Sequence, residues 1–358
     1  MTTSPARRTA SCGGRRGEAN PTLLVAVVMA VLVAAGGLYL FVQRGRTLSS
    51  QAQSPISQDA ARETDWRTVD PALITYQLAG ELPTGLIEPR GIALTPDSQQ
   101  VVVVGDRRLR VLNWQGQPVG EVNLGAKPRC VAVAPDGKRY VGLRDHVEIY
   151  DAAGQRLAQW QPAGPKSYFT SVSVAGDDVF VGDAGQRVVL RYDASGQVVG
   201  LIGQKDPARN IPGIVMPSPH LDVVMGTDGL LRVTNPGRQA VETYDRNGNL
   251  KASWGRPSQA IEGFSGCCNP TDLLSLDDGR WVTAEKGIPR VKVYTAAGVF
   301  ESVVAPPSAL SVTASGMDLA VDSAGRVLVL DPPAKVIRVF APMAPLTVAT
   351  DQKAGSRP

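Results

Sequence analysis

One kind of segment recurs six times along this chain: a short apolar strand followed by an acidic or glycine turn. Examples are GIALTPD at 91–97, CVAVAPDG at 130–137 and DLAVDSAG at 318–325. Aligned on that turn, the units begin at residues 91, 130, 171, 222, 272 and 318. A spacing of about 40–50 residues is typical of propellers and other repeat architectures, so the repeat sets the fold before any single motif does.

The first five units contain the signals of four strands each. A second apolar strand and a third strand of alternating character follow the first, as in RVKVY at 290–294. A tight turn with glycine in a fixed place comes next, for example at 151–154 and 193–196, and a fourth strand follows. The composition is rich in Val, Gly and Pro and lacks helical periodicity, which favours an all-β domain. Six such units predict a six-bladed β-propeller.

The sixth unit stops after three strands, near Phe340, whereas an unassigned strand, LITYQLAGEL at 73–82, precedes the first unit. A propeller that closes its ring needs a fourth strand in every blade. We therefore expect residues 73–82 to pair with the strand at 336–340 and to join the two ends of the domain.

The apolar run at 23–42 carries no charge and is long enough to cross a bilayer as a helix. Four arginines precede it with no acid until Glu18, so the positive-inside rule places the N-terminus in the cytoplasm. A cleaved signal peptide is the alternative, but its apolar region spans about 7–15 residues. We expect a retained signal-anchor in the cell membrane, with a single-pass helix and an extracytoplasmic (periplasmic) propeller. The expected organisation is a basic cytoplasmic tail at 1–20, a transmembrane helix at 21–43, a linker at 44–71, the propeller at 72–343 and a flexible C-terminal tail at 344–358.

The turn between the second and third strands carries a recurring pattern of an apolar residue, an acid, a spacer and a basic residue. It appears as Asp183…Arg187 and Asp331…Lys335, less strictly as Asn235…Arg238 and Glu285…Arg290, and departs to Asp145-His146 in the second unit. In this pattern the chain resembles the NHL-repeat family of six-bladed β-propellers over about residues 74–342. The resemblance implies the fold and leaves function open, because such propellers include enzymes, sensors and scaffolds.

The first strand of each blade should line the central channel. Its starting positions include three acids, Asp222, Asp272 and Asp318, which could hold Ca²⁺ through oxygen ligands or could instead bond to backbone N–H groups of the next blade. One position earlier in the first two blades stand Arg90 and Arg129. Two arginines at a channel mouth could bind an anionic group or could neutralise the acids below them. The sequence leaves both alternatives open.

Three long connections, at 203–220, 255–270 and 305–316, join an outer strand to the next inner strand, so they lie on one face. Long loops on one face of a repeat ring mark its binding side. His220 ends the first of them. The candidate ligand-binding residues are therefore Arg90, Arg129, His220, Asp222, Asp272 and Asp318.

Cys267 and Cys268 are adjacent in the loop at 255–270. Outside the cytoplasm such a pair can close into a disulfide, remain as thiols or bind a soft metal. Cys130 belongs to the opposite blade on the same face, so a site with three sulfurs would require the loop to fold over the channel. These three cysteines form the candidate disulfide or thiol site.

Two enzyme classes known on related propellers can be compared with this chain. The amidating-lyase type holds zinc with several histidines, whereas this chain has only His146 and His220. The gluconolactonase type holds Ca²⁺ with Glu, Asn and Asp, for which Glu88, Asn269, Asp222 and Asp272 are available. The extracytoplasmic part has no basic block that would indicate nucleic acid.

We therefore expect a membrane-anchored binding or scaffold module, with no reaction of its own, for a protein partner or small ligand on the loop face. The alternative is a Ca²⁺-dependent lactonase-like hydrolase, or an accessory to envelope redox chemistry that works through Cys267 and Cys268.

Overall fold

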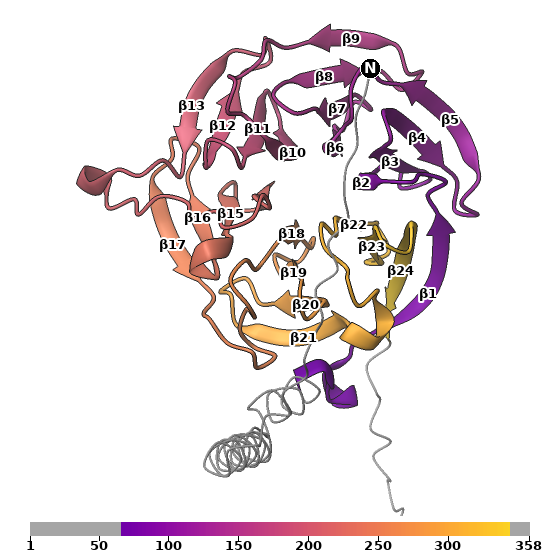
Figure 1. Cartoon of the computed structure of the whole chain (residues 1–358), viewed down its shortest axis with the longest axis vertical. Coiled ribbons are helices and arrows are strands. Elements are labelled where there is room, and N and C mark those ends of the chain that lie inside the picture. Colours follow the sequence, from indigo (N-terminus) through magenta and orange to yellow (C-terminus); the bar gives the residue numbers. More distant parts are fainter. Residues whose placement is uncertain (1–65, 344–358) are drawn as a thin grey trace, which may run out of the picture. The chain divides into compact units, whose positions relative to one another are not determined.

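Six antiparallel sheets of four strands each surround a central axis in the computed structural model, which describes residues 66–343 (Figure 1). Five blades are built from consecutive strands and the sixth from three late strands and the first one. The predicted all-β, six-bladed propeller is confirmed.

The strands of each blade run from the channel outwards. Blade 1 contains β2 (Pro89–Leu94), β3 (Val101–Gly105), β4 (Arg108–Leu112) and β5 (Pro118–Asn123). Blade 2 contains β6 (Cys130–Val133), β7 (Arg139–Gly142), β8 (Val147–Tyr150) and β9 (Arg156–Gln159). Blade 3 contains β10 (Phe169–Ala175), β11 (Asp178–Asp183), β12 (Val188–Tyr192) and β13 (Val198–Ile202). Blade 4 contains β14 (Val223–Met225), β15 (Leu231–Asn235), β16 (Ala240–Tyr244) and β17 (Leu250–Trp254). Blade 5 contains β18 (Asp272–Ser275), β19 (Trp281–Glu285), β20 (Arg290–Tyr294) and β21 (Phe300–Ala305). Blade 6 contains β22 (Leu319–Val321), β23 (Val327–Asp331), β24 (Val336–Pro342) and β1 (Tyr76–Pro83). Four short 3-10 helices complete the described elements: η1 (Pro71–Leu73), η2 (Pro207–Arg209), η3 (Pro236–Arg238) and η4 (Pro307–Ala309).

Within residues 66–343, no helix is both long and apolar enough to span a membrane. The predicted transmembrane helix at 21–43 and the predicted C-terminal tail lie outside the described residues.

The ring closes as predicted, because β1 pairs with β24 from Tyr76↔Pro342 to Pro83↔Val336. The strand begins at Tyr76 rather than at residue 73, since the preceding residues form η1. Asp70 caps this helix by accepting a hydrogen bond from the Ala72 amide (2.9 Å).

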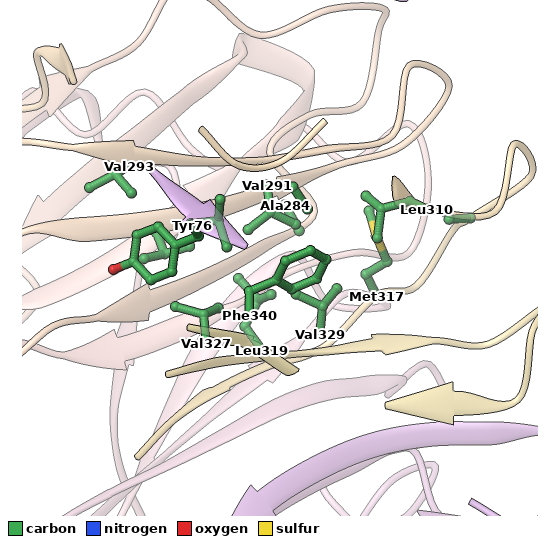
Figure 2. Close-up of a cluster of buried hydrophobic side chains, with 14 of the residues drawn as sticks. Tyr76, Ala284, Val291, Val293, Leu310, Met317, Leu319, Val327, Val329 and Phe340 are labelled. Carbon is green, nitrogen blue, oxygen red and sulfur yellow. The ribbon is translucent and has the colours of Figure 1, made fainter. Parts of the chain in front are cut away.

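Apolar side chains fill the spaces between neighbouring blades, and the period of two along each strand decides which space they fill. In β23, Val327 and Val329 pack in the cluster shared with blade 5, whereas Leu328 and Leu330 pack in the cluster shared with blade 1. Figure 2 shows the first cluster, in which Phe340 lies among these valines. Because both faces are buried, β3 (VVVVG) and β23 (VLVLD) read as nearly continuous apolar runs.

A side-chain acceptor at the end of the second strand holds the loop that enters the same blade. Asp183 accepts from the Tyr168 amide (2.9 Å), Asn235 from Val215 (2.9 Å), Glu285 from Ser265 (2.8 Å) and Asp331 from Ser311 (2.9 Å). In blade 2, Asp145 instead bonds to its neighbour His146 (2.7 Å). In blades 3 to 6 the acceptors of the repeated pattern therefore position the loops that enter the blades.

Candidate functional site

A cavity of about 240 Å³ lies at the channel mouth. Pro219 and His220 reach it from the loop at 203–220, and Ser315 and Gly316 reach it from the loop at 305–316. All six candidate ligand-binding residues line this one cavity: Arg90, Arg129, His220, Asp222, Asp272 and Asp318. The loop at 255–270 does not line it, although Thr271, directly after that loop, does.

A second cavity of about 120 Å³ lies deeper in the channel. Four residues line both cavities: Cys130, Asp222, Asp272 and Asp318. They therefore form a layer, here called the carboxyl layer, that separates the mouth from the inner channel.

Each aspartate of the carboxyl layer binds the backbone of the next blade. Asp222 accepts from the Leu273 amide (2.7 Å), and Asp318 accepts from the Ile92 amide (2.5 Å). Asp272 is likewise hydrogen-bonded to the Leu319 amide. The acids thus join blades 4 to 5, 5 to 6 and 6 to 1, which is the second of the two roles considered for them.

Burial, together with interactions within the layer, shifts the protonation of these acids. Burial raises the pKa of Asp222 to about 6 and that of Asp318 to about 7. Burial and the charges of Asp222 and Asp318 raise the pKa of Asp272 well above its usual value. The hydrogen bond between Asp272 and Asp318 raises the pKa of the former and lowers that of the latter, so Asp272 holds the shared proton. The layer is therefore less negative at neutral pH than three carboxylates would be.

Cys130 completes the layer on the side of blade 2. Burial, followed by the charges of Asp318 and Asp222, raises the pKa of its thiol far above the usual value. A Cβ added to Gly91 of the neighbouring blade would lie 3.1 Å from the Cys130 Cα, so glycine allows these two blades to approach closely. The Cys130 thiol is accordingly a packed, protonated group.

The two arginines at the mouth do not pair with the carboxyl layer. The Arg129 guanidinium lies over the Tyr168 ring, 3.7 Å from its centroid, and makes no salt bridge to a residue within 66–343. Burial lowers the pKa of Arg129, with Tyr168 opposing the shift and Arg90 adding to it. The side chain of Arg90 is 52% exposed and lies 3.6 Å from Glu88. Tyr168, which directly precedes β10 of blade 3, was not among the residues predicted from the sequence.

His220 contributes a neutral ring to the same cavity. Burial, then the charges of Lys286 and Arg90, lowers its pKa to about 4. The imidazole therefore offers one donor and one acceptor at neutral pH. Its place beside two cations, rather than beside an acid, is decided by loops from different blades.

The cysteine pair lies apart from both cavities. The Cys267 and Cys268 Sγ atoms are 2.9 Å apart, with Cys267 exposed and Cys268 buried. Cys268 is also hydrogen-bonded to Ser218, whose Oγ accepts from the Lys286 Nζ (2.8 Å). Among the described residues, no group of three His, Cys, Asp or Glu side chains has an arrangement suited to a metal ion, so the considered site with three sulfurs is not formed.

The residues considered for a calcium site do not converge. The Asn269 amide is fully engaged, since it donates to the Ser265 carbonyl (2.7 Å) and accepts from the Lys286 amide (2.9 Å). Glu88 pairs with Lys127 (2.9 Å) at the rim, outside the mouth cavity. Only Asp222 and Asp272 of that set reach the channel.

Together, the fold and the mouth define a six-bladed β-propeller with a polar channel site. No protein-family model and no curated protein matches the chain. Solved structures do: a streptogramin B lyase has a TM-score of 0.53 at 14% identity, covering 77% of this chain and 90% of that one. A protein of unknown function from Bacteroides thetaiotaomicron has a TM-score of 0.55 at 16% identity (74% and 72%), and virginiamycin B lyase from Staphylococcus aureus has 0.51 at 15% (75% and 90%). These similarities support the propeller fold.

Proposed function

We propose that this protein is a binding module whose channel mouth holds the anionic group of a small ligand. The observation that carries the proposal is Arg129: a partly buried guanidinium with no acidic partner in the described part of the chain, at the wall of a cavity. A cation that is partly removed from water without a counter-ion is costly, and an anionic ligand would offset that cost.

The mouth is suited to a carboxylate or phosphate group. Stacking on Tyr168 fixes the plane of the Arg129 guanidinium, which leaves its N–H groups in a rigid fork that matches such anions. Arg90 adds a second positive charge nearby. The volume of about 240 Å³ is below the usual range for drug-sized ligands, so the ligand is small or inserts only one group.

Two of the similar structures are lyases, and fold alone does not transfer a reaction. The binding proposal rests instead on the side chains of this chain. Of the residues considered for calcium, two are engaged away from the mouth, so the lactonase-like alternative has no observation in its favour.

The proposed setting is the outer face of a membrane. The apolar run at 23–42 supports a single-pass anchor, and the acid–spacer–base pattern supports kinship with NHL-repeat propellers. In this setting the face formed by the loops at 203–220, 255–270 and 305–316 would meet the ligand or the protein that carries it.

The test compares two probes of matched shape, benzoate and neutral benzamide, by calorimetry or by NMR titration. We expect benzoate to bind saturably and benzamide not to bind. Arg129→Gln should weaken benzoate binding about tenfold or more. Lys205→Gln removes the same charge from the same loop face outside the cavity, and it should have no effect. Equal binding of both probes, or unchanged benzoate affinity in Arg129→Gln, would contradict the proposal.

A further inference from the structure

The adjacent cysteines combine one accessible and one buried sulfur at short range. Cys267 is exposed, Cys268 is buried, and their Sγ atoms lie 2.9 Å apart. A disulfide requires about 2.05 Å, so a movement of less than an ångström separates the thiols from a bond. The two sulfurs are therefore placed for reaction with each other.

The surroundings of Cys268 stabilise its thiolate. Burial acts to raise its pKa, but the hydrogen bonds from Cys267 and Ser218 and the charge of Lys286 outweigh it, and the pKa of Cys268 is lowered. The same hydrogen bond raises the pKa of Cys267, so the proton of the pair stays on Cys267. Lys286 also donates to the Ser218 hydroxyl (2.8 Å), which fixes that hydroxyl beside the sulfur. Cys130 has the opposite environment, because burial and then the neighbouring acids Asp318 and Asp222 keep its thiol protonated. Residues 66–343 thus contain a poised pair and an unreactive thiol.

We propose that Cys267 and Cys268 form a thiol–disulfide exchange site for organic disulfides. Cys267 transfers its thiol proton to the adjacent Cys268 sulfur and attacks one sulfur of a disulfide RSSR, giving a mixed disulfide and releasing RS⁻, which takes that proton from Cys268. The Cys268 thiolate then attacks the Cys267 sulfur, closes the Cys267–Cys268 bond and releases the second RS⁻. Two electrons pass from the cysteine pair to RSSR, and the two thiol protons end on two RSH. This proposal does not depend on the anionic-ligand proposal.

The experiment treats the reduced, full-length protein with glutathione disulfide, followed by acid quenching, trypsin and mass spectrometry. Both cysteines fall in one tryptic peptide, 252–280, whereas Cys130 falls in another. We expect the 252–280 peptide to lose the mass of two hydrogens while the Cys130 peptide stays a free thiol. A pair that remains reduced, or glutathione found on Cys130 instead, would overturn the proposal.

Single substitutions separate the two steps. Cys268→Ser should stop at a mixed disulfide on Cys267, because no thiol remains to resolve it. Cys267→Ser should react at least about tenfold more slowly, because Cys268 is buried. Equal reactivity of the two variants would contradict the assigned order. Circular dichroism of each variant checks the fold, and binding of benzoate need not change in either.

Lys286→Gln tests the positioning role of the lysine. The closing step should slow several-fold near pH 7 and recover near pH 9, where the thiolate forms without help. Lys286→Arg should retain most of the rate at pH 7. A loss of rate that is independent of pH would show that Lys286 does not act through the Cys268 thiolate.

Discussion

At the residue scale, the aspartates of the carboxyl layer act as structural links between blades. The Asp222 carboxylate accepts one hydrogen bond from the amide of the following residue, Val223 (2.8 Å), and one from the Leu273 amide of the next blade (2.7 Å). Neighbouring inner strands belong to different sheets, so a side chain must satisfy amides that no ladder partner reaches. The same acids form the floor of the mouth cavity, which couples ring integrity to the site.

Asp222→Ala should therefore destabilise the domain. It removes the acceptor of two buried amides, and we expect a loss of about 1–3 kcal/mol in the free energy of unfolding. Urea denaturation measures this loss. Asp277→Ala, which changes an exposed acid in a turn, should stay within about 0.5 kcal/mol of the original chain. If both changes lower the free energy of unfolding equally, Asp222 does not stabilise the contact between blades 4 and 5.

The raised pKa of Asp318, about 7 in the folded state, predicts a pH dependence of stability. Because the folded pKa lies above the unfolded value of about 3.8, this group contributes stability that is complete below that value and is lost as pH rises through 7. Asp318→Asn keeps an oxygen acceptor for Ile92 but cannot titrate. The stability of the variant relative to the original chain should therefore increase from pH 5 to pH 8, as followed by melting temperature.

The titration of His220 changes stability with pH in the opposite direction to that of Asp318. Its folded pKa of about 4 lies below its unfolded value, so it reduces stability as pH falls from about 6.5 to 4. This contribution is present in both chains and cancels in their difference. A difference that does not change with pH would show that Asp318 does not titrate in this range.

At the element scale, the acceptors at the ends of the second strands connect blade structure to the site. The fully buried Asp183 carboxylate accepts hydrogen bonds from the amides of Tyr168 (2.9 Å), Gly185 (3.0 Å) and Gln186 (3.0 Å). The Tyr168 ring in turn supports Arg129. The conformation of one turn in blade 3 thus fixes a guanidinium of blade 2.

Asp183→Ala should weaken both stability and binding. We expect a loss of more than about 2 kcal/mol, because several buried amides lose their acceptor, and a several-fold loss of benzoate affinity, because Tyr168 is released. Urea denaturation and calorimetry measure the two effects. Asp177→Ala, an exposed acid in the same blade, is the matched control. If Asp183→Ala is destabilised but binds benzoate with the original affinity, the turn at Asp183 does not position Arg129.

The closing strand β1 is the other element with a predicted effect. A chain that starts at Gly85 lacks the whole ladder from Tyr76 to Pro83 and exposes the edge of β24. We expect it to lose several kcal/mol and to aggregate, since an open sheet edge pairs with other chains. Melting and light scattering, compared with a chain that starts at Trp66, measure this. Identical melting would mean that the closure adds no stability.

At the scale of the whole molecule, the sequence predicts attachment to a membrane. After cell fractionation the intact protein should sediment with membranes, and protease added from the outside should remove the propeller. The physical reason is the uncharged run at 23–42 behind a basic tail. A soluble form that begins near residues 38–44 would show instead that the run is a cleaved signal peptide.

The sequence by itself determined the number of blades, the closing strand and six of the residues at the channel mouth. These follow from periods in the sequence: the strand alternation is present within each unit and the repeat spacing runs through residues 91–340. The alignment of repeats then places equivalent residues at equivalent depths. This is why Arg90, Arg129 and Asp318, distant in sequence, could be assigned to one place.

Only the tertiary structure decided what those side chains do. That Arg129 stacks on Tyr168, that His220 lies beside Lys286 and that Ser218 lies beside Cys268 depends on contacts between blades. Such contacts have no period in the sequence, because they are set by how far one sheet is rotated and displaced against the next. The protonation of the carboxyl layer follows from the same packing, since burial and mutual charge act only once the ring has closed.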